Sequence, residues 1–147
     1  MCWEEKLNML YGKDNLKAYA VLQELEILSE KEDALYPYFE QFLEMLQSEK
    51  YMIRMRGLRL LCKQAKWDKK NKIDENINEI LSTLEDKKPT AVRQALKALE
   101  DIVVCKPGLH RRIKEKAEAV NYMAYKDTMH HLIKKDIQRL REIMEHV

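Results

Sequence analysis

Apolar residues recur along this chain at helical spacing, and two long stretches of the pattern repeat each other. Residues 35–65 and 73–103 superimpose at an offset of 38 residues, apolar position on apolar position. Phe39 and Phe42, for example, correspond to Ile77 and Ile80. Spacings of three and four residues place such side chains on one face of a helix. Each stretch therefore predicts two helices joined by a turn.

The second helix of each predicted pair carries a small residue within its apolar face. Gly57 stands in the first copy where Ala95 stands in the second. Glycine costs roughly 1 kcal/mol of intrinsic helix propensity relative to alanine. We therefore expect Gly57 to lie where two helix axes approach closely.

Repeated helix pairs predict a single all-α domain over residues 1–147. Capping helices are expected in 1–34, followed by helix pairs in 35–68, 73–106 and 109–146. Stacked pairs of this kind form α-solenoids, in which each pair contacts only its neighbours. The expected architecture is a right-handed α-α superhelix of about seven helices.

Two helix boundaries carry specific signals. Pro89 is expected to open a helix, since a first-turn position requires no N–H donor. Asp127 is placed to cap the last helix with its carboxylate.

One segment resembles a known repeat family. Val92–Leu99, with its Val-Arg pair ahead of small residues and leucine, resembles the second-helix motif of HEAT repeats. The resemblance extends over roughly residues 35–144. Tyr36–Phe39, Arg54–Gly57 and Ala65–Asp68 are together similar to a small group of uncharacterised bacterial HEAT-like proteins. These resemblances imply a HEAT/armadillo-like fold and a role in protein binding or as a scaffold.

Arg54 departs from the HEAT-like motif, because it stands where Val92 stands in the next copy. A guanidinium beside an apolar stripe requires a partner that meets its charge and its hydrogen-bond donors. We expect Arg54 to pair with Glu79 or Asp86 of the next layer.

Composition limits the class of protein and its location. Hydrophobic residues make up 46% and charged residues 35%, with only three Gly and three Pro, as expected of a helical domain. The longest apolar run, residues 18–22, is far shorter than the roughly 20 residues of a membrane-spanning helix. The start does not resemble a secretory signal, and Cys2, Cys62 and Cys105 lie too far apart to suggest a disulfide framework. We predict a cytoplasmic protein without membrane contact.

No pattern of residues predicts catalysis, a cofactor or a metal site. His130 and His131 are adjacent, so on a helix they point about 100° apart and cannot chelate one ion. Gly12, Gly57 and Gly108 are isolated and form no phosphate-binding loop. The chain is therefore predicted not to be an enzyme and to hold no cofactor or metal.

Basic residues form rows on the predicted second helices. Arg56, Arg59 and Lys63 fall at i, i+3 and i+7, and Arg93 and Lys97 form a shorter row on the corresponding helix of the next pair. The predicted partner-binding residues are Arg56, Arg59, Lys63, Arg93, Lys97 and Lys134. Stacked helices would bring these rows side by side as one positive face.

Several partners fit such a face. The favoured one is an acidic protein or peptide surface, engaged by a non-catalytic interaction or scaffold module. The alternative is nucleic acid, bound through the same residues. A HEAT-like base glycosylase is a third, less favoured interpretation. The oligomeric state stays open, since residues 1–50 hold 5 Lys/Arg and 11 Asp/Glu whereas residues 51–147 hold 22 and 14, which permits head-to-tail contact between copies.

Overall fold

The computed structural model describes residues 2–147, and most of these residues are helical, with no strand among them. The all-α prediction is confirmed. The α-helices are α1 (Trp3–Met9), α2 (Asn15–Lys31), α3 (Phe39–Met45), α4 (Tyr51–Lys63), α5 (Lys72–Glu75), α6 (Ile77–Leu81), α7 (Pro89–Cys105), α8 (His110–Glu118) and α9 (Asp127–Glu145). Short 3-10 turns are η1 (Tyr36–Tyr38), η2 (Gln64–Trp67), η3 (Ser82–Glu85), η4 (Pro107–Leu109) and η5 (Tyr122–Ala124).

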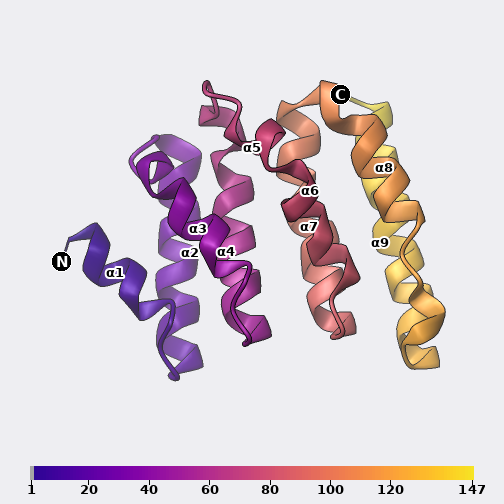
Figure 1. Ribbon diagram of the computed structural model, residues 1–147, viewed down its shortest axis with the longest axis horizontal. Coiled ribbons are helices and arrows are strands. Elements are labelled where there is room, and N and C mark those ends of the chain that lie inside the picture. The colour runs from indigo at the N-terminus through magenta and orange to yellow at the C-terminus, as the bar shows by residue number, and fades with distance from the viewer. Residues whose placement is uncertain (1) are drawn as a thin grey trace.

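The longer helices stand side by side in chain order. Figure 1 shows α2, α4, α7 and α9 as a row across the molecule, with α3, α6 and α8 lying against its near side and the two termini at opposite ends. Helix α4 packs on α2, α3 and α7, and α7 packs on α4 and α9. Each long helix therefore has long helices as neighbours on both sides or lies at an end of the row.

The repeated apolar positions form the core between these helices. Phe39 and Phe42 are fully buried, as are Ile77 and Ile80 at the matching places. Leu35 and Ile73, which precede them, are buried as well. The sequence repeat thus reports equivalent packing positions in the two copies.

Gly57 lies at the contact between α3 and α4. A Cβ atom at this position would stand 2.5 Å from the Cβ of Met45 and 2.9 Å from the carbonyl oxygen of Phe42. Both atoms belong to or adjoin the α3 backbone, so a side chain at 57 would force the two helices apart. The expected close approach is confirmed.

The first helix of the pair expected in 73–106 is divided. Asn76 interrupts it with φ −110° and ψ 17°, and the chain continues as α5, α6 and η3. The Asn76 amide donates to the carbonyl oxygen of Lys72 at 2.8 Å, a local bond that competes with the regular helix. With this division the described residues contain nine α-helices, against about seven expected.

The two boundary predictions have different outcomes. Pro89 is the first residue of α7, as expected. Asp127 is already the first residue of α9, and the capping position belongs to Lys126, whose side chain makes no capping bond. The expected Asp127 cap is therefore wrong.

Arg54 connects α4 to the next layer of the row. Its Nε and Nη2 donate to the two carboxylate oxygens of Asp86 at 2.9 and 3.1 Å. Its Nη1 donates to the carbonyl oxygens of Ser48 and Glu49. The expected pairing with Asp86 is confirmed, and the same guanidinium also satisfies the carbonyls of the preceding turn.

The buried carboxylate of Asp68 connects the first helix pair to the second. The Asp68 side chain is fully buried and accepts hydrogen bonds from Tyr36 Oη at 2.5 Å and from the backbone N–H groups of Lys72 and Ile73, both at 2.9 Å. Lys106 Nζ lies 3.0 Å from it. Burial raises the pKa of Asp68, but these bonds outweigh burial and hold the pKa below its usual value.

Candidate interaction groove

The predicted basic residues lie on three helices of the long row. Arg59 and Lys63 belong to α4, Arg93 and Lys97 to α7, and Lys134 to α9. Because α4 packs on α7 and α7 packs on α9, their rows are neighbours, as expected from the repeat. Arg59, Lys63 and Arg93, however, form ion pairs with carboxylates of neighbouring helices.

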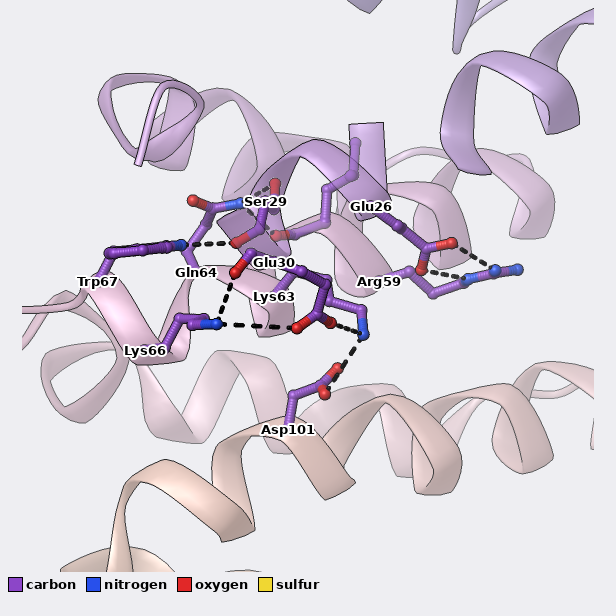
Figure 2. A network of polar contacts seen from close by, with 10 residues as sticks. Glu26, Ser29, Glu30, Arg59, Lys63, Gln64, Lys66, Trp67 and Asp101 are labelled. Carbon is purple, nitrogen blue, oxygen red and sulfur yellow. Dashed lines mark hydrogen bonds and ion pairs between the residues drawn. The ribbon is translucent and has the colours of Figure 1, made fainter. Parts of the chain in front are cut away.

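Carboxylates of α2 pair with Arg59 and Lys63 of α4. Arg59 donates from Nε and Nη2 to the two oxygens of Glu26 at 3.0 and 2.7 Å. Lys63 Nζ lies 2.6 Å from Glu30 and 3.5 Å from Asp101 of α7. Figure 2 shows Lys63 between these two carboxylates, with the Arg59–Glu26 pair beside them. Arg59 and Lys63 are thus held in ion pairs between helices.

The Lys63 cluster perturbs the pKa values of its members. Burial lowers the pKa of Lys63, but the bonds to Glu30 and Asp101 outweigh burial and leave this pKa raised. Burial raises the pKa of Asp101, and the attraction of Lys63 offsets only part of that effect.

The same pattern joins α7 to α9. Arg93 donates to both oxygens of Asp136, with Nε at 2.7 Å, and this bond raises the pKa of Arg93. Arg139 of α9 donates in the opposite direction to Glu100 of α7 at 3.1 Å. Bidentate pairs of this kind fix the relative position of two helices as well as cancelling charge.

Arg56 lies inside the molecule, with 6% of its surface exposed. Its Nη1 donates to the carbonyl oxygen of Leu10 at 2.8 Å and its Nη2 to the side-chain oxygen of Asn15 at 3.1 Å. Burial lowers the pKa of Arg56. The residue anchors the α1–α2 connection, a role that differs from the partner-facing one expected from the sequence.

Lys97 and Lys134 are exposed, and they differ in their surroundings. Lys134 Nζ stands 5.0 Å above the ring of Tyr122, a cation–π contact. For Lys97, no carboxylate within residues 2–147 lies inside the 4.0 Å of an ion pair. Among residues 2–147, neither Lys97 nor Lys134 has a carboxylate as ion-pair partner, and Lys97 lines the hollow beside α4.

A groove runs over α4 between α2 and α7. One part has a volume of about 570 Å³ and the adjoining part about 410 Å³, and Tyr19, Arg59 and Gln94 line both. Arg59 and Lys63 of α4 form its floor, because residues of α2 and α7 line the same hollow on either side. We call this hollow the α2–α4–α7 groove.

The α2 wall of the groove exposes large apolar side chains. Leu16, Tyr19 and Ile27 are 84%, 48% and 59% exposed. They lie on α2 opposite to its buried residues, Ala18, Val21, Leu22, Leu25 and Ser29. A helix with apolar residues on two sides signals a second packing surface. These apolar positions can be read from the sequence of α2, but a prediction based on basic residues alone does not find them.

Two absences among the described residues concern the class of site. Within residues 2–147, no three His, Cys, Asp or Glu side chains gather as a metal site would require. None of the helices described here combines the length and apolarity needed to cross a bilayer.

Comparison with known proteins identified no relative: no protein-family model, no curated protein and no solved structure matches this chain.

Proposed function

We propose that this chain is a HEAT-like α-solenoid, a right-handed superhelix of helix pairs, that acts as a non-catalytic protein–protein interaction module. The fold supports the first part, since the core positions repeat at 38 residues and the long helices stand in chain order. In such stacks each added pair extends a surface instead of enclosing a site.

The observation that carries the function is the α2–α4–α7 groove with its exposed apolar wall. Leu16, Tyr19 and Ile27 lie on one helix beside a hollow, whereas the core positions of the same helix are fully covered. Grouped exposed apolar side chains rimmed by charges are typical of protein interaction sites. Fully covering an exposed Leu or Ile side chain contributes about 1.5–3 kcal/mol, and covering Tyr19 and Ile27 contributes less because each is already about half covered.

The ion pairs favour a protein partner over nucleic acid. Phosphates bind to cations whose charge is available, and Arg59, Lys63 and Arg93 are each matched by carboxylates of neighbouring helices. A polyanion would have to displace Glu26, Glu30 and Asp136 from them. A flat dependence of duplex DNA affinity on salt would agree with this reasoning. The groove carboxylates are likewise held in ion pairs, which does not favour a base glycosylase.

Site-specific photocrosslinking tests the proposed function. Tyr19 is replaced by a benzophenone amino acid, which has a similar aromatic body and points into the groove, and cells producing the protein are irradiated. The matched control carries the same group at Glu115, an exposed position on α8. We expect discrete protein adducts from position 19 that disappear when Ile27→Glu is added. Equal adducts from both positions, or adducts insensitive to Ile27→Glu, would contradict the proposal.

A further inference from the structure

We propose that a hollow between the α1–α2 connection and the start of α4 binds a small phosphate monoester, whose phosphate group meets Arg56. This site goes beyond the interaction module proposed above, because its ligand is a small molecule. In Figure 1 the α1–α2 connection and the α3–α4 turn both lie at the lower edge of the molecule. We call the space between them the Arg56 hollow, and its lining includes Tyr11, Lys13, Glu49, Lys50, Tyr51 and Arg56.

Arg56 is a buried cation without a carboxylate partner. It is 6% exposed, and within residues 2–147 it forms no ion pair. Two neutral oxygens, the Leu10 carbonyl and the Asn15 side-chain oxygen, accept from its Nη1 and Nη2. Burial lowers the pKa of Arg56, and no carboxylate charge counters that effect. Because a buried charge is costly without an opposite charge beside it, this guanidinium favours an incoming anion.

The guanidinium end of Arg56 reaches the hollow. Its partners Leu10 and Asn15 flank the α1–α2 connection, which forms one edge of the hollow through Tyr11 and Lys13. Within residues 2–147 the Nε of Arg56 has no acceptor, and this atom keeps some solvent-accessible surface. A guanidinium has five N–H donors, so a ligand in the hollow finds donors that the protein does not use.

The first turn of α4 adds two backbone donors to the same hollow. Lys50 is the capping residue of α4, and its side chain makes no capping bond. The N–H groups of Tyr51 and Met52 donate to no residue of the described chain, and both residues line the hollow. Free N–H groups and the helix dipole favour a phosphate at the start of a helix, and α4 is 13 residues long.

The charges of the lining suit a dianion. Lys13, Lys50 and Arg56 stand against the single carboxylate of Glu49, which leaves a surplus of two positive charges. None of the four forms an ion pair with another residue of 2–147. A phosphate monoester carries about 1.5 to 2 negative charges at pH 7, whereas a carboxylate carries one. The surplus therefore favours a phosphate over a carboxylate.

The remaining lining suits an apolar body attached to the phosphate. The rings of Tyr11 and Tyr51 lie on the two sides of the hollow, since they belong to the α1–α2 connection and to α4. A flat ring packs well against either of them. The hollow has a volume of about 370 Å³, within the range of roughly 300–1,000 Å³ that is typical of small-molecule sites. Phenyl phosphate is therefore a suitable probe.

An NMR titration of the full ¹⁵N-labelled chain tests the site. Phenyl phosphate is compared with benzoate, inorganic phosphate and benzyl alcohol. We expect saturable shifts of the Tyr51 and Met52 amide signals and of the Arg56 Nε–H signal. Phenyl phosphate should bind about fivefold or more tightly than benzoate or inorganic phosphate, because only this probe has both the dianion and the ring. Benzyl alcohol should leave these signals unchanged.

Two variants assign the binding to the hollow. Arg56→Met should weaken phenyl phosphate binding about tenfold or more, since it removes a charged donor. Lys50→Glu should weaken it about fivefold or more, since the new carboxylate repels the phosphate. An acidic residue at the start of a helix is favourable, so Lys50→Glu keeps the fold and decides the question if Arg56→Met does not fold. The control Lys135→Glu makes the same charge change at an exposed position of α9 and should bind like the wild type.

Three results would overturn the inference. The first is phenyl phosphate shifts that do not saturate or that avoid Tyr51, Met52 and Arg56. The second is wild-type affinity in Lys50→Glu, or an equal loss in Lys135→Glu. The third is benzoate binding as tight as that of phenyl phosphate, which would contradict the choice of a dianion. Each leaves the interaction module standing, because its crosslinking test uses Tyr19, which does not line the Arg56 hollow.

Discussion

Replacing Gly57 with alanine sets two opposing effects against each other. Alanine is favoured over glycine within a helix by about 1 kcal/mol, so at an open position of α4 the substitution would stabilise the protein. Here the added Cβ would stand 2.5 Å from the Met45 Cβ and 2.9 Å from the Phe42 carbonyl oxygen. Neither atom can move without the backbone of α3.

The magnitude follows from this geometry. Carbon atoms in contact lie about 3.5–4.0 Å apart, so α3 must shift by roughly 1 Å across the tightly packed first pair. Overpacking of this kind costs about 1–3 kcal/mol and can cost more where backbone must move. Because the α3 backbone must move, we take a cost of about 3 kcal/mol. Subtracting the roughly 1 kcal/mol gained in helix propensity leaves an expected net loss of about 2 kcal/mol in the free energy of unfolding, or a fall in Tm of about 6 °C.

Urea unfolding followed by circular dichroism measures this loss. The midpoint should fall while the slope m stays that of the wild type, since the surface exposed on unfolding barely changes. Gly108→Ala is the matched control, because no atom lies within 4 Å of a Cβ at that position. It should be neutral or stabilising by up to about 1 kcal/mol. If Gly57→Ala proves as stable as Gly108→Ala, the close-approach reasoning is refuted.

Three further predictions concern the joints between helices. Asp68→Asn should cost about 3 kcal/mol at pH 7, since it removes the buried carboxylate that accepts from Tyr36 and two backbone N–H groups and leaves Lys106 with Asp74 alone. The pKa of Asp68 is lowered in the folded state, so its contribution is present above about pH 4 and is lost as the pH falls through the lower folded value. The difference between wild type and variant in urea midpoint should therefore shrink at pH 3, and a constant difference would contradict this. Arg54→Met should cost about 2–3 kcal/mol by thermal unfolding, because Asp86 loses a bidentate partner, and an unchanged Tm would count against that role. Tyr125→Phe should cost about 1 kcal/mol by urea unfolding, since the Tyr125 hydroxyl donates to the Asp86 carbonyl oxygen, and no loss would mean that water replaces this bond.

The packing of this fold could be predicted from the sequence because the apolar spacing reports it directly. Ile77 and Ile80 repeat the spacing of Phe39 and Phe42, and a repeated spacing predicts an equivalent packing environment. All four side chains are buried in the structure. The close approach at Gly57 was predictable for a related reason, since glycine in mid-helix has a cost that only packing offsets. The interruption of the helix at Asn76 was harder to predict from the sequence, because it depends on one side chain that donates to the backbone carbonyl of Lys72.

The candidate site was predictable only in part. Basic spacing placed Arg59, Lys63 and Lys97 on neighbouring helices, as the structure has them. It could not show that Glu26 meets Arg59, because charges on separate helices pair according to the register of stacking, which sequence spacing alone does not give. It also could not separate Arg56 from Arg59, since a three-residue step on α4 carries one guanidinium inward and leaves the other at the groove.

The connection between α1 and α2 holds the buried Arg56 in place, a structural role that its sequence alone does not indicate. The carbonyl of Leu10 and the amide oxygen of Asn15 solvate this cation in place of water. A fragment trimmed to begin within α2 would leave a stranded guanidinium in the middle of the first helix pair. The connection between α1 and α2 thus contributes to the stability of the first helix pair.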